Sequence, residues 1–160
     1  MQGRQLEIDL CRQELWVVEQ GARTRRFSIS TSRFGPGENA DSGCTPRGAH
    51  VIRAMIGHGL PAGACFVGRR YTGEVWSPEL AHSAPGRDWI LSRVIWLSGC
   101  EPGCNRLGAV DTMRRYIYIH GTPDNAPMGV PFSHGCIRMR NADVIELFEL
   151  VAAGMSVEIG

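Results

Sequence analysis

A histidine and a cysteine in the last third of the chain have the residue types and spacing of a nucleophile and its base. His120 is followed by Gly121, and Cys136 ends the run Ser133–Cys136. A nearby imidazole favours the thiolate form of a cysteine, which is the reactive nucleophile. The pair therefore indicates nucleophilic catalysis by a thiol.

Gly135, directly before Cys136, strengthens this interpretation. A glycine there permits close approach of a substrate and lets backbone N–H groups converge on one point. Such convergence is how an oxyanion hole for acyl transfer is built. A cysteine taken at random is more often a small buried apolar residue, so it is the setting that marks Cys136.

Two histidines compete for the role of base. His134 lies two residues before Cys136, and the two would share a face if this segment were extended. His120 follows a predicted strand, so it can be oriented independently, with a carbonyl such as that of Gly121 fixing its tautomer. We favour His120. Because every histidine precedes Cys136, a papain-like order is excluded.

Arg138 lies two residues beyond Cys136 and could occupy the same face. Its planar guanidinium suits a substrate carboxylate in a bidentate pair. A structural ion pair fits the spacing equally well, and both interpretations stay open.

The composition excludes several chemistries. All 17 basic residues are arginine, so no Schiff-base lysine, no P-loop lysine and no Ser-x-x-Lys acylation site exists. A net charge of +1 gives no broad field for binding nucleic acid. Nothing in the sequence calls for a cofactor. Structural zinc is a weak alternative, because Cys100, Cys104, His120, His134 and Cys136 lack finger-like spacing.

The first 20 residues have no apolar export signal, and no apolar run reaches the length of a membrane span. The six cysteines have no framework spacing. We therefore expect reduced thiols and a cytoplasmic location if the chain is complete. A periplasmic or wall-associated location is expected if an export signal has been removed.

The elements that must position these residues are mostly strands. Alternating or β-branched stretches predict strands at 5–10, 15–18, 26–30, 50–57, 94–97, 116–119 and 156–159. The first three should form an antiparallel meander, and residues 32–48 a loop.

One helix is expected, with Asn141 as its N-cap and Gly154 closing its far end. Residues 58–92 are expected to be irregular. A connection of this length is often a lid or groove wall, and whether this one acts as a lid is left open by the sequence. Residues 1–160 should therefore form a single, mainly β domain with one substantial helix.

The runs Tyr116–Thr122, Ser133–Met139 and Asn141–Leu147 together resemble the L,D-transpeptidase catalytic (YkuD) family. Residues Thr45–Gly48 extend the similarity weakly towards the N-terminus. The resemblance implies a β-sandwich with a helix after the segment of the active cysteine.

The resemblance also implies acyl transfer on peptidoglycan stem peptides. The thiolate would attack the carbonyl between a diamino acid, typically meso-diaminopimelate, and the following D-alanine. By motif position the nucleophile is Cys136, its base His120 and the orienting carbonyl that of Gly121. Ser133, His134 and Gly135 would form the nucleophile loop, with Gly135 among the catalytic positions. Substrate contacts are implied at Ser133, His134 and Arg138.

The acyl acceptor is left open by the sequence. An amine acceptor makes a transpeptidase, whereas water makes an L,D-carboxypeptidase that trims soluble muropeptides in a cytoplasmic recycling role. Carbapenems are expected to acylate the cysteine in either case. The alternative of another class is a peptidoglycan-binding domain without catalysis.

Overall fold

Three antiparallel strands form a meander at the N-terminus, as predicted, but the third begins earlier than expected and covers Ala22–Ser28 instead of 26–30. They are β1 (Arg4–Asp9), β2 (Glu14–Glu19) and β3 (Ala22–Ser28). Leu6 and Leu15 are fully buried while their neighbours along each strand are more exposed. A computed structural model of the chain describes residues 3–160.

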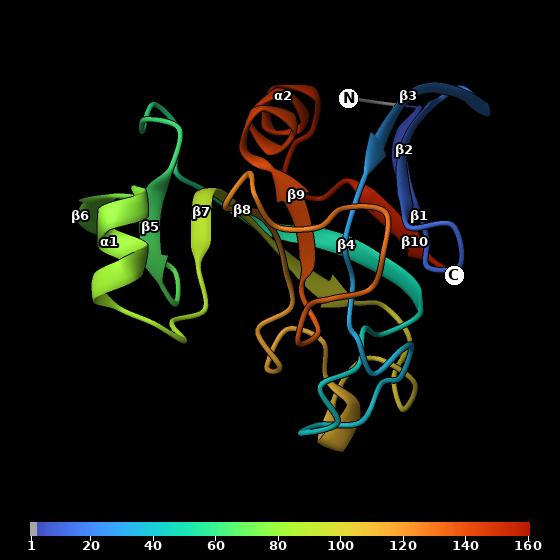
Figure 1. Cartoon of the computed structure of the whole chain (residues 1–160). Helices are drawn as coiled ribbons and strands as arrows, with labels where there is room; N and C mark the ends of the chain where they lie inside the picture. The colour runs from blue at the N-terminus through green and yellow to red at the C-terminus, as the bar shows by residue number, and fades with distance from the viewer. Residues whose placement is uncertain (1–2) are drawn as a thin grey trace.

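The other strands extend this meander into a branched sheet (Figure 1). They are β4 (Gly48–Ile56), β5 (Ala64–Val67), β6 (Arg70–Val75), β7 (Ile90–Gly99), β8 (Tyr118–Thr122), β9 (Ile137–Arg140) and β10 (Ser156–Ile159). Over residues 3–160 the order is β3-β2-β1-β10-β4-β7-β5-β6, while β8 joins β7 to β9. A short 3₁₀ turn, Gly108–Val110, lies between β7 and β8.

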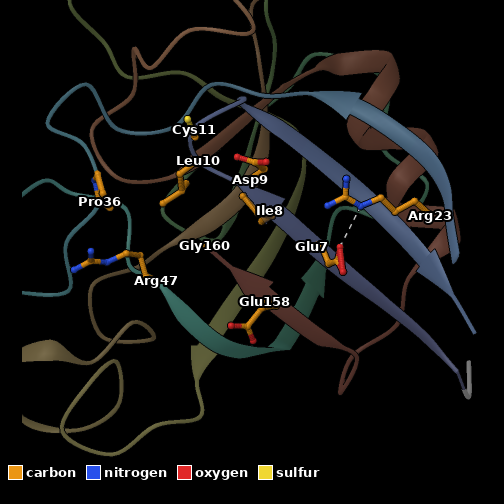
Figure 2. A pocket seen from close by; sticks show the side chains of 10 residues that line it. All are labelled: Glu7, Ile8, Asp9, Leu10, Cys11, Arg23, Pro36, Arg47, Glu158 and Gly160. Carbon is orange, nitrogen blue, oxygen red and sulfur yellow. Dashed lines mark hydrogen bonds and ion pairs between the residues drawn. The ribbon is translucent and has the colours of Figure 1, made fainter. Parts of the chain in front are cut away.

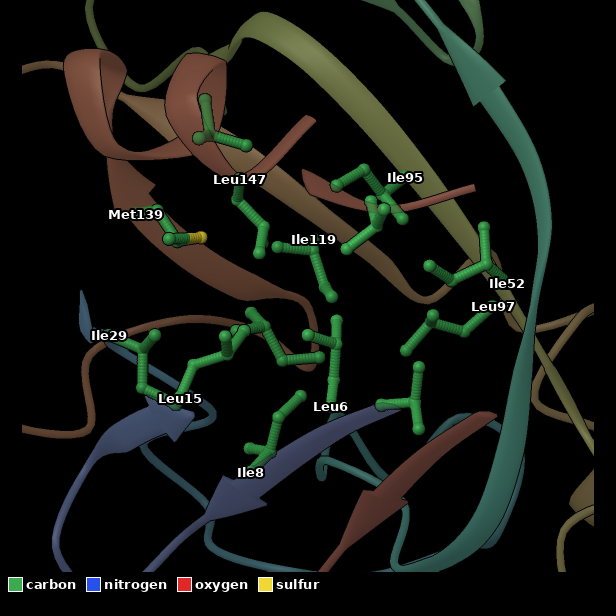
Figure 3. Packing of buried hydrophobic residues seen from close by; sticks show 14 of the residues in the cluster. Leu6, Ile8, Leu15, Ile29, Ile52, Ile95, Leu97, Ile119, Met139 and Leu147 are labelled. Atoms are coloured by element: carbon green, nitrogen blue, oxygen red, sulfur yellow. The ribbon is translucent and has the colours of Figure 1, made fainter. Parts of the chain in front are cut away.

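The sheet curls so that its N-terminal strands face β7, β8 and β9 across one apolar core. Figure 3 shows Leu6 and Leu15 on one side of this core, and Ile119 and Met139 on the other. Such interdigitation of two facing layers is typical of a β-sandwich. The predicted mainly β class with one substantial helix is confirmed.

That helix, α2 (Asn141–Leu150), packs Val144 and Leu147 into the core. Its predicted ends are wrong. Arg140 holds the N-cap position, because the Asn141 side chain is engaged elsewhere and the helix has no side-chain cap. Gly154 lies beyond the helix in the turn before β10, where its N–H donates to the Ile52 carbonyl at 2.7 Å.

The expectation of an irregular segment over residues 58–92 is also wrong. It contains β5, β6 and a short helix, α1 (Pro78–Ser83). Gly68, with φ +57°, forms the tight turn between β5 and β6. Ser77 accepts the Leu80 N–H at 3.1 Å and begins α1. No helix within residues 3–160 has both the length and the apolar character needed to cross a bilayer.

Candidate active site

Strand pairing places Cys136 beside His120. Strands β8 and β9 are parallel, with His120 opposite Arg138 and Ile119 opposite Ile137. Directly paired residues project to the same face, and alternate residues along a strand share that face. Cys136, just before β9, therefore lies on the face of Tyr118 and His120, whereas Ile119 and Ile137 face the core.

Two backbone groups hold the sulfur of Cys136. The Tyr118 N–H donates to Sγ at 3.3 Å, and the thiol donates to the Tyr116 carbonyl at 3.3 Å. The half-buried residue packs against a second apolar cluster that includes Val94 and Tyr118. Burial raises the pKa of Cys136 to about 12, although the Tyr118 N–H favours the thiolate. The resting residue is therefore a neutral thiol.

His120 is held as a neutral acceptor. Only 1% of the residue is exposed, and this burial lowers its pKa below the ordinary value. Its Nδ1 lies 2.6 Å from the Gly121 carbonyl. An acceptor at this distance requires the proton on Nδ1, which leaves Nε2 free to take a proton. The backbone also departs from expectation here, because β8 begins at Tyr118 and includes His120 within the strand.

These two pKa shifts predict how Cys136 reacts with iodoacetamide at different pH values. A thiol with its pKa raised to about 12 loses its proton progressively as the pH rises, so its thiolate fraction grows about tenfold per pH unit below that value. We expect the alkylation rate of Cys136 to climb throughout pH 7–10, measured by mass spectrometry of its own peptide. A plateau below pH 8 would instead reveal a resting imidazolium–thiolate pair.

Gly121 is required by the close approach of two neighbours. A Cβ at this position would lie 2.5 Å from the Leu91 carbonyl oxygen and 2.6 Å from Asn141 Oδ1. Asn141 itself ties β7 to the end of β8, because Oδ1 accepts from Ser92 Oγ at 2.5 Å and Nδ2 donates to the Thr122 carbonyl at 3.0 Å. The carbonyl that orients His120 is thus fixed by packing on both sides.

Gly121→Ala is expected to damage both the fold and the site. The added methyl group must push Leu91 or Asn141 away, which costs about 1–3 kcal/mol, and it displaces the carbonyl that binds His120. We expect a lower free energy of unfolding in urea and about tenfold slower acylation by a carbapenem, since small displacements of reacting groups are expensive. The control is Gly160→Ala, where an added Cβ meets nothing within 4 Å. Equal stability and acylation in the two variants would contradict this account.

The loop before Cys136 is stabilised from inside. Ser133 is 1% exposed, and its hydroxyl donates to the Cys136 carbonyl at 2.6 Å and accepts the Gly135 N–H at 3.2 Å. Gly135 has φ +128°, and its carbonyl accepts from the buried Thr45 hydroxyl at 2.9 Å. The N–H of Gly135 is therefore used within the loop. Contact of Ser133 with substrate stays a prediction.

His134 does not lie in the extended segment that would place it on the same face as Cys136. Residues 133–136 bend through Gly135 instead of running extended, so His134 and Cys136 need not share a face. His134 is exposed and lines a cavity of about 350 Å³ with Asp41, Arg115 and Tyr116. This geometry favours His120 as the base.

Arg138 lies on the predicted face but already has an acidic partner. Its Nη2 is 3.1 Å from Asp88 Oδ1, and its Nη1 donates to the Phe132 carbonyl at 3.2 Å. Only 14% of the Arg138 side chain is exposed, against 56% of that of Asp88. Both interpretations of Arg138 are thus compatible with the structure.

Comparison with known proteins identifies the family. The profile of the YkuD L,D-transpeptidase catalytic domain matches residues 3–159. The chain belongs to the L,D-transpeptidase catalytic domain family. The resemblance seen in the sequence is thereby confirmed.

Individual relatives of this L,D-transpeptidase domain agree. It is 48% identical to the probable L,D-transpeptidase YbiS of Escherichia coli (strain K12) over 44 residues, or 28% of this chain and 14% of that protein. An L,D-transpeptidase from Mycobacterium smegmatis superposes with a TM-score of 0.62 at 16% identity, over 99% of this chain and 58% of the other. The chain thus spans less than two thirds of each.

A third relative is L,D-transpeptidase 3 from Mycobacterium tuberculosis in complex with a faropenem-derived adduct. It superposes with a TM-score of 0.59 at 13% identity, covering 98% of this chain and 60% of the other. At such identities the two superpositions establish a shared fold.

A separate cavity of about 600 Å³ in this L,D-transpeptidase domain lies away from the candidate site. Figure 2 shows its lining on β1, β10 and the neighbouring loops, including Ile8, Leu10 and Glu158. None of the predicted site residues lines it. The cavity and the candidate site are therefore separate features of the fold.

The zinc alternative finds no support in the arrangement of side chains. Within residues 3–160, no three His, Cys, Asp or Glu side chains converge as a metal ion would require. Cys100 and Cys104 are both exposed, in the turn after β7.

Sequence reasoning missed the residues that position this L,D-transpeptidase site from a distance. Asp88 pairs with Arg138, the Tyr118 N–H donates to the Cys136 sulfur, and the Asn141 amide donates to the Thr122 carbonyl at the end of β8. Tyr118 and Asn141 stood inside the quoted motif runs without a signal of these contacts. Thr45 was quoted only as part of the weak extension of the motif.

Proposed function

We propose that the chain catalyses cysteine-dependent acyl transfer on peptidoglycan stem peptides, cleaving the bond between the L-centre of a diamino acid and a terminal D-alanine. One observation carries the proposal: Cys136 and His120 lie on one face of adjacent strands, and the Gly121 carbonyl leaves Nε2 of His120 free. Membership of the L,D-transpeptidase catalytic domain family supports this choice of substrate class.

The resting protonation states suit a concerted first step. As the Cys136 sulfur attacks the carbonyl carbon, its proton passes to Nε2 of His120, so no free thiolate is needed beforehand. The bond to D-alanine breaks, and His120 returns the proton to the departing amine. The product is a thioester on Cys136.

The second step resolves the thioester. A water molecule or an amine attacks it, His120 removes the proton from this nucleophile, and the Cys136 sulfur leaves and recovers a proton. Water yields a shortened tripeptide, whereas the amine of a second stem peptide yields a crosslink. The acceptor depends on the compartment, so water would fit a cytoplasmic role and an amine a periplasmic or wall-associated one.

β-Lactams follow from the same chemistry. Attack of Cys136 on the strained ring carbonyl would leave a stable acyl-enzyme, and we propose carbapenems and penems as covalent inhibitors. The faropenem-derived adduct in a structural relative supports this expectation.

The test is incubation with a disaccharide-tetrapeptide, followed by mass spectrometry of released D-alanine. Accumulation of tripeptide without exchange of added D-amino acids would assign water as the acceptor. Dimer formation or efficient exchange would assign transpeptidation. Binding of the tetrapeptide without release of D-alanine or acylation would overturn catalysis and favour a peptidoglycan-binding role.

A further inference from the structure

Asp88 is exposed and contacts the site through Arg138. It belongs to the connection between α1 and β7, and its Oδ1 is 3.1 Å from Nη2 of Arg138. Its neighbour Arg87 anchors the connection, because Nη2 is 2.9 Å from Glu74 Oε1 and the guanidinium lies 4.4 Å from the centre of the Trp89 ring. The contacts of Arg87 thus hold the connection that carries the Asp88 carboxylate.

Arg138 occupies a position from which it can reach a ligand on Cys136. It pairs with His120 across the β8–β9 ladder and follows Cys136 by two residues, so all three share one face. The Phe132 carbonyl on Nη1 is neutral, whereas Asp88 on Nη2 balances the charge of the guanidinium. The Asp88 carboxylate therefore occupies the edge of the Arg138 guanidinium that could bind the carboxylate of a ligand.

The contrast in exposure indicates which of the two partners can be exchanged. Arg138 has a side chain only 14% exposed, so leaving its charge without a partner is unfavourable. Asp88 is 56% exposed and regains water readily when it leaves. An ion pair with one solvent-exposed partner is weak, and another carboxylate can replace Asp88 without leaving Arg138 unpaired.

We propose that Asp88 is a specificity-determining residue, which occupies the carboxylate site of Arg138 until the carboxylate of a ligand displaces it. With the proposed function, on which the identity of the ligand rests, that group is the carboxylate of the terminal D-alanine. A ligand without a carboxylate leaves Asp88 in place. The negative charge of Asp88 then continues to raise the pKa of Cys136 and to oppose formation of the thiolate.

Two small alkylating reagents test this displacement without relying on the natural substrate. Iodoacetate carries a carboxylate and iodoacetamide does not, but in both cases sulfur bonds to the CH₂ carbon and iodide leaves. Their rate ratio at Cys136, followed on its own peptide, cancels differences in thiolate fraction. We expect Asp88→Asn to raise the iodoacetate/iodoacetamide ratio about three- to fivefold, the upper range for a partly exposed ion pair.

A double-mutant cycle separates displacement from a general change in charge. In an Arg138→Gln background, Asp88→Asn should leave the ratio unchanged, because the contested site is gone. The matched control is Glu146→Gln, which removes a carboxylate from the exposed pair with Arg25 outside the site. An unchanged ratio in Asp88→Asn alone, or an equal rise in both backgrounds, would overturn the proposal. Asp88 is exposed, so Asp88→Asn should fold, and an unchanged ratio in this variant overturns the proposal even if Arg138→Gln folds poorly.

A second measurement distinguishes failure of this inference from failure of the proposed function. The tetrapeptide and its C-terminal amide are compared by kcat/KM for release of D-alanine or its amide. Asp88→Asn should favour the free acid over the amide more strongly than the wild type does. A responsive alkylation ratio without any release would keep the role of Asp88 and remove the proposed function. Release of D-alanine with an alkylation ratio that does not change in Asp88→Asn would keep the proposed function and remove the role of Asp88.

Discussion

Replacing Cys136 with alanine is expected to abolish release of D-alanine from the tetrapeptide, by roughly 10⁴-fold or more, as for loss of other catalytic nucleophiles. Among residues 3–160, no other cysteine is held between the backbone groups of Tyr116 and Tyr118 beside His120. The chain also has no lysine to supply a substitute nucleophile. The measurement is D-alanine by mass spectrometry, with circular dichroism to confirm folding.

The matched control for this variant is Cys100→Ala. Cys100 is exposed in the turn after β7 and takes no part in the site, so turnover should equal that of the wild type. Persistent turnover in Cys136→Ala would exclude the thioester mechanism altogether.

Removing His120 should produce the second-largest loss. With His120→Ala the thiol of Cys136, whose pKa is raised to about 12, has no group to take its proton at neutral pH. Loss of a general base costs about 10²–10⁴-fold. We expect this decrease in the rate of carbapenem acylation, measured by intact protein mass, whereas exposed His134→Ala should stay within about twofold of the wild type.

Because His120 is buried, a second variant is needed to distinguish loss of the base from loss of the folded structure. His120→Gln can keep a donor towards the Gly121 carbonyl, so its thermal stability should approach that of the wild type while acylation stays slow. A larger loss in His134→Ala than in His120→Ala would assign the base to His134 instead.

The predictable part of the site lies within short sequence distances. His120 and Gly121 are neighbours, and Cys136 and Arg138 are two residues apart, so a motif can carry them together. The strands β1 and β2 could also be predicted from the sequence, since the spacing of apolar residues such as Leu6 and Ile8 indicates that one face of the strand is buried.

The parts that sequence reasoning missed depend on contacts between distant segments. Asp88 meets Arg138 across 50 residues, and Thr45 meets Gly135 across 90. Neither contact leaves a local pattern, because an aspartate or a threonine in a loop is ordinary there.

Other misses had a local signal. Ser77 followed by a proline is a helix start, and Gly68 between two apolar runs is a hairpin turn. The prevalence of glycine, proline and serine in residues 58–92 hid both.

The parallel pairing of β8 with β9 has a consequence for how this site can fail. A shift of that pairing by one residue would turn Ile137 towards the substrate and Arg138 into the apolar core. Burying the Arg138 guanidinium in the apolar core without a partner is unfavourable, so the shifted register is strongly disfavoured. A one-residue shift of this pairing should therefore inactivate the site as a whole, because Cys136, His120 and Arg138 would no longer share one face.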